Sequence, residues 1–250
     1  MERESEDMRT EVETAAERLK RAGRVLALTG AGISAESGVP TFRGPEGLWR
    51  QYRPEELATP EAFEADPKLV WEWYAWRREK IAPLSPNAAH RALADLESRT
   101  EHFLLATQNV DRLHQQAGSR NLVELHGSIW ELRCTGCGRS HEDRRVPLGD
   151  LPPRCSCGSI ERPGVVWFGE SLPEDAVALA WAAARVAEVV LVIGTSSLVY
   201  PAAALPQVAK GAGGFVIEVN PERTPLTPMA DVSLRGKAVE IVPALVEAAR

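Results

Sequence analysis

An apolar run that ends in a glycine-rich turn constrains the fold of this chain more than any other feature. Val25 to Leu28 reads as a buried strand, and the turn follows it directly. We expect Gly30 and Gly32 to adopt backbone angles closed to other residues and to let a ligand approach the main chain. A helix start beyond them would point N–H groups at an anion. With Ala35 in the third place, the spacing fits the relaxed dinucleotide fingerprint, so the expected ligand is a pyrophosphate.

The segment after the turn differs from that of a dehydrogenase. In a dehydrogenase one unbroken helix leads to the next strand, and an acidic residue follows about 20 positions on. Here Gly38 and Pro40 interrupt the segment. The loop beyond them, Thr41 to Gly44, carries an aromatic ring and a cation close to where a ribose would lie. This pattern favours chemistry at a sugar over hydride transfer.

Size and charge exclude several classes of protein. The chain has 250 residues, 44% of them hydrophobic, which is enough for a substantial core. A net charge of -6 argues against a protein built to grip nucleic-acid phosphates. The longest apolar stretch, Ala176 to Ala184, is too short to cross a bilayer, and the start of the chain is highly charged. We therefore expect a cytoplasmic protein without a membrane partner.

Apolar runs of strand length alternate with helical stretches. The expected strands are 25–28, 103–106, 122–125, 189–193, 215–219 and 232–234, and the expected helices are 8–22, 111–117, 173–187 and 238–249. This alternation predicts an α/β fold, a Rossmann-like parallel sheet with helices on both faces. Because ligands of such sheets lie at the carboxyl ends of the strands, the polar residues that follow these runs should converge on one site.

The chain has four cysteines, in two close pairs, and no secretion signal, so a metal site is favoured over disulfides. They are Cys134, Cys137, Cys155 and Cys157. Four thiolates complete the tetrahedral shell of one structural Zn²⁺. The second pair has a single intervening residue where two are usual, so a water or His141 could take one of the four positions.

Two segments interrupt the alternation, a tryptophan-rich helical stretch and the cysteine-bearing stretch. We interpret both as parts of a smaller lobe, with a substrate cleft between the lobes. The predicted division is a dinucleotide-binding domain of 1–41, 101–133 and 164–250, a helical insertion of 42–100 and a zinc-binding module of 134–163.

Further motifs follow the glycine turn in a fixed order. They are Thr107-Gln108-Asn109-Val110-Asp111, Leu125-His126-Gly127, the paired cysteines, Val165-Val166-Trp167-Phe168-Gly169-Glu170 and Gly194-Thr195-Ser196-Ser197. With them the chain resembles the sirtuin family over roughly residues 10 to 249, and segment 35–44 resembles its class III branch. The resemblance implies an NAD-dependent protein-lysine deacylase that acts on acetyl-, succinyl- or malonyl-lysines of cellular proteins.

His126 is the candidate general base, and the resemblance implies Asn109 as the second catalytic residue. His126 follows a strand at the ligand edge, where a neutral imidazole can accept a ribose hydroxyl proton near pH 7. As the resemblance implies, the acyl-lysine oxygen displaces nicotinamide, and His126 activates the ribose hydroxyls that attack the adduct. Lysine, nicotinamide and acyl-ADP-ribose would be the products.

The resemblance also implies which residues bind NAD. Phe42 would shield the sugar from water, and Arg43 would engage the phosphates. Asp111 could contact the ligand, cap a helix, or do both. The expected NAD contacts are Gly30, Ala31, Gly32, Ile33, Ser34, Ala35, Glu36, Thr41, Phe42, Arg43, Trp49, Gln108, Asn109, Val110, Asp111, Gly194, Thr195, Ser196, Asn220, Pro221, Glu222 and Ala238.

The segment from Val166 to Gly169 has the character of an exposed sheet edge. By resemblance it pairs with the substrate peptide as an added strand. The alternative is a core strand that packs with Trp167 and Phe168, and both can hold at alternate positions.

Tyr74 and Arg77 share one face of a helix predicted to begin near Asp66. A phenol and a guanidinium together can donate hydrogen bonds to a carboxylate. They resemble the class III residues that bind the acid end of a succinyl-lysine. The alternative is a packed tyrosine beside a surface ion pair. Ala58 and Ala62 are small enough to widen the acyl pocket.

Three other functions compete with deacylation. Transfer of ADP-ribose to a protein side chain would use the same sugar chemistry, although Tyr74 and Arg77 favour deacylation. A zinc-ribbon module that binds nucleic acid leaves His126 and Asn109 unexplained and conflicts with the acidic net charge. A dehydrogenase would show hydride transfer to bound NAD. Because the net charge is acidic, we expect no direct nucleic-acid partner.

Overall fold

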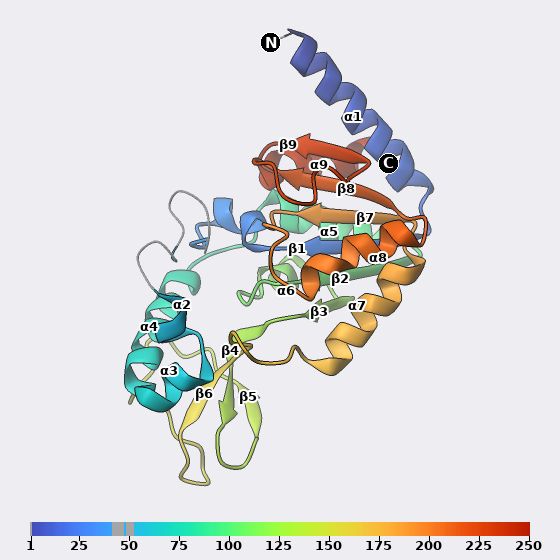
Figure 1. Ribbon diagram of the computed structural model, residues 1–250. Helices are drawn as coiled ribbons and strands as arrows, with labels where there is room; N and C mark the ends of the chain where they lie inside the picture. The colour runs from blue at the N-terminus through green and yellow to red at the C-terminus, as the bar shows by residue number, and fades with distance from the viewer. Residues whose placement is uncertain (1, 42–47, 49–52) are drawn as a thin grey trace.

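The computed structural model describes residues 2–41, 48 and 53–250, with side chains from residue 9 onward. Figure 1 shows two lobes. The larger is a parallel sheet between layers of helices, and the smaller combines short helices with a three-stranded sheet. The predicted α/β fold class with a second, smaller lobe is confirmed.

The large sheet has the strand order β3-β2-β1-β7-β8-β9 in the described part of the chain, and its neighbouring strands are parallel. They are β1 (Arg24–Thr29), β2 (His102–Thr107), β3 (Leu122–Glu124), β7 (Val189–Ile193), β8 (Phe215–Asn220) and β9 (Val232–Arg235). The strand order reverses between β1 and β7. Because a crevice opens at the carboxyl ends of strands at such a switch point, the glycine turn after β1 lies where a ligand is expected.

Helices cover both faces of this sheet. They are α1 (Glu2–Arg21), α5 (Ala88–Arg99) and α9 (Ala238–Ala248) on one face, and α7 (Glu174–Val186) and α8 (Leu205–Gly211) on the other. Alternation along β1 serves both cores, since Ala27 packs in the first and Leu28 in the second. None of the described helices combines the length and apolar character that a membrane span requires.

The small lobe has its own apolar core, which includes Trp71, Trp73 and Trp130. Its elements are α2 (Pro54–Leu57), α3 (Pro60–Ala65), α4 (Pro67–Ile81), β4 (Gly127–Cys134), β5 (Ser140–Glu142) and β6 (Glu161–Val165), with β4 in the centre of the antiparallel sheet. Helix α4 begins as predicted, because the Asp66 side chain accepts the Leu69 N–H at 3.0 Å.

The glycine turn departs from the sequence expectation. After β1 the chain forms two 3₁₀ turns, Ala31–Ile33 and Ala35–Ser37, in place of a helix start. Gly30 has an ordinary φ of -129°, so a left-handed backbone does not explain the glycine. A Cβ on Gly30 or Gly32 would instead lie 2.9 or 2.7 Å from the Gly194 backbone. The glycines are needed because the turns after β1 and β7 pack backbone against backbone.

One further helix boundary differs from the sequence expectation, and two other elements bear on the predicted domain division, which stays a prediction. Helix α6 (Leu113–Ala117) starts two residues later than predicted, because Arg112 has a left-handed φ of 63°. Helix α5 lies within the predicted helical insertion but packs with α9 in the core of the large sheet. Strand β4 falls largely within the predicted large domain, but it pairs with β5 and β6. We propose that α5 belongs to the large lobe and β4 to the small lobe.

Candidate active site

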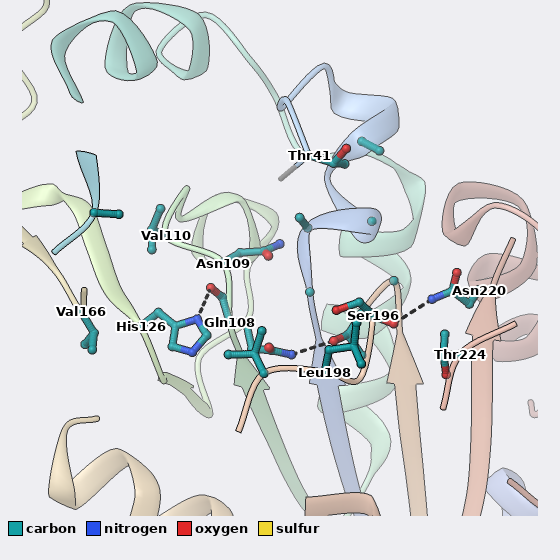
Figure 2. Close-up of a pocket in the computed structure, with 18 of the residues that line it drawn as sticks. Thr41, Gln108, Asn109, Val110, His126, Val166, Ser196, Leu198, Asn220 and Thr224 are labelled. Atoms are coloured by element: carbon teal, nitrogen blue, oxygen red, sulfur yellow. Dashed lines mark hydrogen bonds between the residues drawn. The ribbon is translucent and has the colours of Figure 1, made fainter. Parts of the chain in front are cut away.

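A cavity of about 650 Å³ lies at the carboxyl ends of the large sheet, between the two lobes. The predicted site residues that line it are Gly30, Ala31, Gly32, Ala35, Glu36, Thr41, Tyr74, Arg77, Gln108, Asn109, Val110, His126, Val166, Trp167, Phe168, Gly169, Gly194, Thr195, Ser196, Asn220, Pro221, Glu222 and Ala238. In Figure 2, His126 and Val166 lie toward one end, and Asn220 and Thr224 lie toward the other. Residues from both lobes thus share one cavity.

Some predicted NAD contacts do not line this cavity. Ile33, Ser34 and Asp111 are buried and belong to the layer behind the lining residues. Their direct contact with NAD stays a prediction. The remaining three, Phe42, Arg43 and Trp49, lie outside the described residues.

The geometry of His126 fixes which ring nitrogen can accept a proton. Nδ1 lies 3.0 Å from the backbone oxygen of Gln108, a contact drawn in Figure 2. Because a carbonyl oxygen only accepts, Nδ1 carries the hydrogen and the lone pair of the neutral ring lies on Nε2. Burial lowers the pKa of His126 from its ordinary 6.5, against the opposing effect of the Gln108 bond. The imidazole is therefore neutral near pH 7.

Asn109 is held in place by two hydrogen bonds. Its backbone N–H donates to Thr107 Oγ1 at 3.1 Å, and its side-chain Nδ2 donates to Ser34 Oγ at 3.1 Å. Ser34 Oγ also lies 3.2 Å from His90 Nε2. With Nδ2 engaged, the side-chain oxygen Oδ1 is the polar atom of Asn109 that can accept from a ligand.

The N-cap residue of α6 is Arg112, one residue after the predicted Asp111. The Asp111 Oδ1 nevertheless accepts the Leu113 N–H at 2.9 Å at the start of α6. Burial raises the pKa of Asp111, and the Leu113 bond, the Ser34 hydroxyl and the nearby charge of Arg77 oppose that shift. The carboxyl group thus lies between Ser34 and Arg77 of helix α4.

Hydrogen bonds join the strand ends across the cavity floor. Gln108 Nε2 donates to Thr195 Oγ1 at 3.0 Å, and Asn220 Nδ2 donates to the Thr195 backbone oxygen at 2.9 Å. The ends of β2, β7 and β8 are therefore tied together before any ligand binds. Preorganisation of this kind reduces the free energy that ordering would cost on binding.

Tyr74 and Arg77, the predicted acyl-selectivity residues, lie in the small-lobe wall of the cavity. Tyr74 is 2% exposed and Arg77 is 5% exposed, so the alternative of a surface ion pair is wrong. The Trp167 indole donates to the Tyr74 hydroxyl at 2.9 Å. The Arg77 guanidinium lies 4.9 Å from the Trp73 ring centroid. Burial lowers the pKa of Arg77 and raises that of Tyr74.

Strand β6 ends at Val165, so segment 166–169 belongs to no strand of the described structure. Its pairing with a substrate peptide stays a prediction. The Val166 N–H donates to the His126 oxygen at 3.0 Å, and the Phe168 N–H donates to the Ala58 oxygen at 2.9 Å. Trp167 is buried while Phe168 is 44% exposed, as the expectation of alternate positions requires. Ala58 lines the cavity, whereas Ala62 is not among its lining residues.

The four cysteines form one cluster. Their Sγ atoms all lie within 4.8 Å of one another, so a single zinc ion could take all four thiolates as ligands. The Ser159 backbone N–H, followed by Cys134, lowers the pKa of the Cys157 thiol to about 6. Both sulfurs of the pair with one intervening residue lie in the cluster, and His141 lies outside it.

Removal of zinc is expected to destabilise the protein. A chelator or Cys157→Ser should lower Tm by about 10 °C or more, because the free energy of metal binding contributes to folding. Metal analysis of the native protein should give one zinc per chain. Ser156→Ala, at an exposed position between two of the cysteines, is the control and should leave both quantities unchanged. Native protein that is fully stable without zinc would contradict the assignment.

Sequence reasoning missed part of the cavity wall, including Leu198, Val199 and Tyr200 in the loop after β7. Leu198 and Tyr200 are 56% and 64% exposed. Large apolar side chains with such exposure often mark a binding surface. Their position directly after Gly194-Thr195-Ser196-Ser197 could have indicated that they lie near the site. Their exposure, however, cannot be predicted from the sequence alone.

The chain is similar to proteins and solved structures of one family. The sequence model of the Sir2 family matches residues 30–201. An NAD-dependent protein deacylase from Aquifex aeolicus is 57% identical over 215 residues, 86% of this chain and 90% of that protein. A crystal structure of a Sir2 homolog–NAD complex has a TM-score of 0.90 and 53% identity, covering 95% of this chain and 93% of the other.

A second similar structure contains a Sir2 protein with a deacetylated p53 peptide and 3′-O-acetyl ADP-ribose. It has a TM-score of 0.84 and 35% identity, and the match covers 93% of this chain and 96% of the other. The chain belongs to the Sir2 family, that of the sirtuins, and is an enzyme of its NAD-dependent protein deacylase class. The resemblance predicted from the motifs is thereby confirmed.

Proposed function

We propose that this chain removes acyl groups from protein lysines, transfers them to the ADP-ribose part of NAD, and accepts succinyl and malonyl as well as acetyl groups. One observation carries the proposal: His126, the strand-end glycines and the pair Tyr74 and Arg77 line the same cavity. Relatives named as deacylases and a structure with a p53 peptide support the substrate class. The partners would be acylated lysines of cellular proteins.

The cavity wall at the carboxyl ends of the large sheet suits NAD. The closely packed turns at Gly30, Gly32 and Gly194 line the cavity, and glycine turns at strand ends suit a diphosphate. Gln108 and Asn109 offer amides near His126 for the ribose and the nicotinamide. NAD supplies the ribose that accepts the acyl group and the nicotinamide that leaves. His126 Nε2 is positioned to take a proton from a ribose hydroxyl.

The small-lobe wall suits an acyl chain that ends in a carboxylate. Burial lowers the pKa of Arg77, and the nearby Tyr74 and then Asp111 oppose that shift. Anionic groups near a buried guanidinium stabilise its charge. A substrate carboxylate would add a charge-assisted hydrogen bond with Arg77. The Tyr74 oxygen already accepts from Trp167, so its own O–H is available to donate to the same carboxylate.

The peptide chain of the substrate would lie along the segment from Val166 to Gly169. Phe168 faces outward, and the segment is anchored to His126 on one side and to Ala58 on the other. Because three of its N–H groups, those of Val166, Trp167 and Phe168, are already engaged, pairing with a peptide would use the remaining backbone groups.

A mass-spectrometric assay tests the proposal. Acetyl-, malonyl- and succinyl-lysine peptides of one sequence are incubated with the protein, with and without NAD. We expect NAD-dependent loss of each acyl group, with stoichiometric nicotinamide and acyl-ADP-ribose. Intact succinyl and malonyl peptides beside a consumed acetyl peptide would refute the proposed selectivity. Intact peptides of all three kinds would refute the function.

The pH profile is expected to report the protonation of His126. Only the neutral imidazole accepts a proton, so kcat/KM should rise with pH and level off at neutral pH. Because burial lowers the pKa of His126, the midpoint of the rise should lie below the ordinary 6.5. Steady-state kinetics between about pH 5 and 8 measure it. A midpoint above 7 would contradict the assignment.

A further inference from the structure

Glu218 is a charged residue within an apolar strand. Its neighbours in β8, Ile217 and Val219, are fully buried, and Glu218 itself is 1% exposed. By strand alternation it shares a sheet face with Val216, which packs in the apolar core beneath α7 and α8. A carboxylate in such a place is costly unless donors surround it.

Four side-chain donors surround this carboxylate. Oε2 accepts from Thr227 Oγ1 at 2.8 Å and from Ser233 Oγ at 2.6 Å. It also accepts from the Arg235 guanidinium at 3.0 Å. Oε1 accepts from the Thr224 hydroxyl. Two donors come from the loop after β8 and two from the adjacent strand β9, so one carboxylate joins the loop to the sheet.

The same loop forms the cavity wall at the end away from His126. Residues 220–225 line the cavity, and Figure 2 shows Asn220 and Thr224 there. Arg235, held by Glu218, donates to the backbone oxygens of Asn220, at 3.3 Å, and Glu222. The Thr224 N–H donates to Thr227 Oγ1 at 2.9 Å. The shape of this wall therefore depends on contacts that converge on Glu218.

We infer that Glu218 is a positioning residue for NAD: it fixes loop 220–225 in the shape that receives the adenosine half of the dinucleotide. The inference rests on the proposed function, because it requires that NAD occupy the cavity. Glu218 lies behind the wall and contacts neither the acyl end nor His126. Its loss should therefore weaken binding of NAD and leave acyl transfer from the bound complex intact.

The test is Glu218→Gln, which keeps the size of the side chain and removes its charge. Arg235 then loses its charged acceptor, and an amide cannot accept from all four donors. We expect the KM for NAD and the Kd for ADP-ribose to rise about tenfold. The kcat and the KM for an acetyl-lysine peptide should stay within about twofold. Calorimetry with ADP-ribose measures binding without any acyl peptide.

Glu97→Gln is the matched control. Glu97 accepts the backbone N–H groups of Arg120 and Asn121, at 3.1 and 2.8 Å, and so holds a loop that does not line the cavity. A purely structural role would lower Tm in both variants and leave the KM for NAD unchanged in both. That result for Glu218→Gln would overturn the inference.

Two milder variants cover the case in which Glu218→Gln does not fold. Thr227→Val and Ser233→Ala each remove one donor, and each should raise the Kd for ADP-ribose in the same direction. Folded variants with native ADP-ribose affinity would overturn the inference. Failure of the proposed function gives a different result, because the native protein would then bind ADP-ribose and leave every acyl peptide intact.

Discussion

His126→Ala is expected to lower kcat/KM for every acyl-lysine peptide by about 10²- to 10⁴-fold, the range that a positioned general base contributes. The Gln108 carbonyl fixes the Nδ1 hydrogen and leaves Nε2 as the acceptor, and alanine removes that acceptor altogether. Because the base acts on bound reactants, the Kd for ADP-ribose should change little. Steady-state kinetics with one acetyl and one succinyl peptide, together with calorimetry, measure both quantities.

His102→Ala makes the same chemical change at an exposed position, since the His102 side chain is 68% exposed at the start of β2. It should leave kcat/KM unchanged. Full turnover by His126→Ala would exclude the role of general base. A parallel loss of activity and of ADP-ribose affinity would instead mean that the ring holds the cavity together.

Local signals carried the parts of the site that the sequence predicted correctly. The polar residues after β1, β2, β7 and β8 converge because parallel strands end at one edge, which is a consequence of topology alone. The cysteine pairs were also a local signal, since two close pairs in turns favour one shared metal site. The alternation of Trp167 and Phe168 followed from the two-residue period of an extended chain.

The features that the sequence did not predict depend on contacts between segments that lie far apart in the chain. Gly30 and Gly32 are glycines because the Gly194 backbone packs on them, and no local pattern contains that contact. Helix α5 has an ordinary amphipathic pattern, which does not say which of two cores it covers. Glu218 lies within an apolar run, and its donors come from a loop and another strand.

Arg77→Met is expected to lower kcat/KM for a succinyl-lysine peptide by about 10- to 100-fold, the loss typical of a hydrogen bond to a charged group. The guanidinium is 5% exposed in the cavity wall, where little water competes for a substrate carboxylate. Methionine keeps much of the volume against Trp73, so the pocket should stay filled. An acetyl group ends before it could reach a charged partner, so deacetylation should change by about twofold or less.

Lys80→Met is the matched control for this selectivity, because it removes one positive charge from the exposed side of the same helix, α4. It should leave both reactions unchanged, which separates a local contact from a general effect of net charge. Arg77→Lys should restore only part of desuccinylation, since a point charge replaces a planar group with several donors. Equal losses of desuccinylation and deacetylation in Arg77→Met would show that Arg77 supports the small lobe and does not read the acyl group. The ratio of desuccinylation to deacetylation, measured on peptides of one sequence, therefore shows whether Arg77 recognises the acyl carboxylate or only packs in the cavity wall.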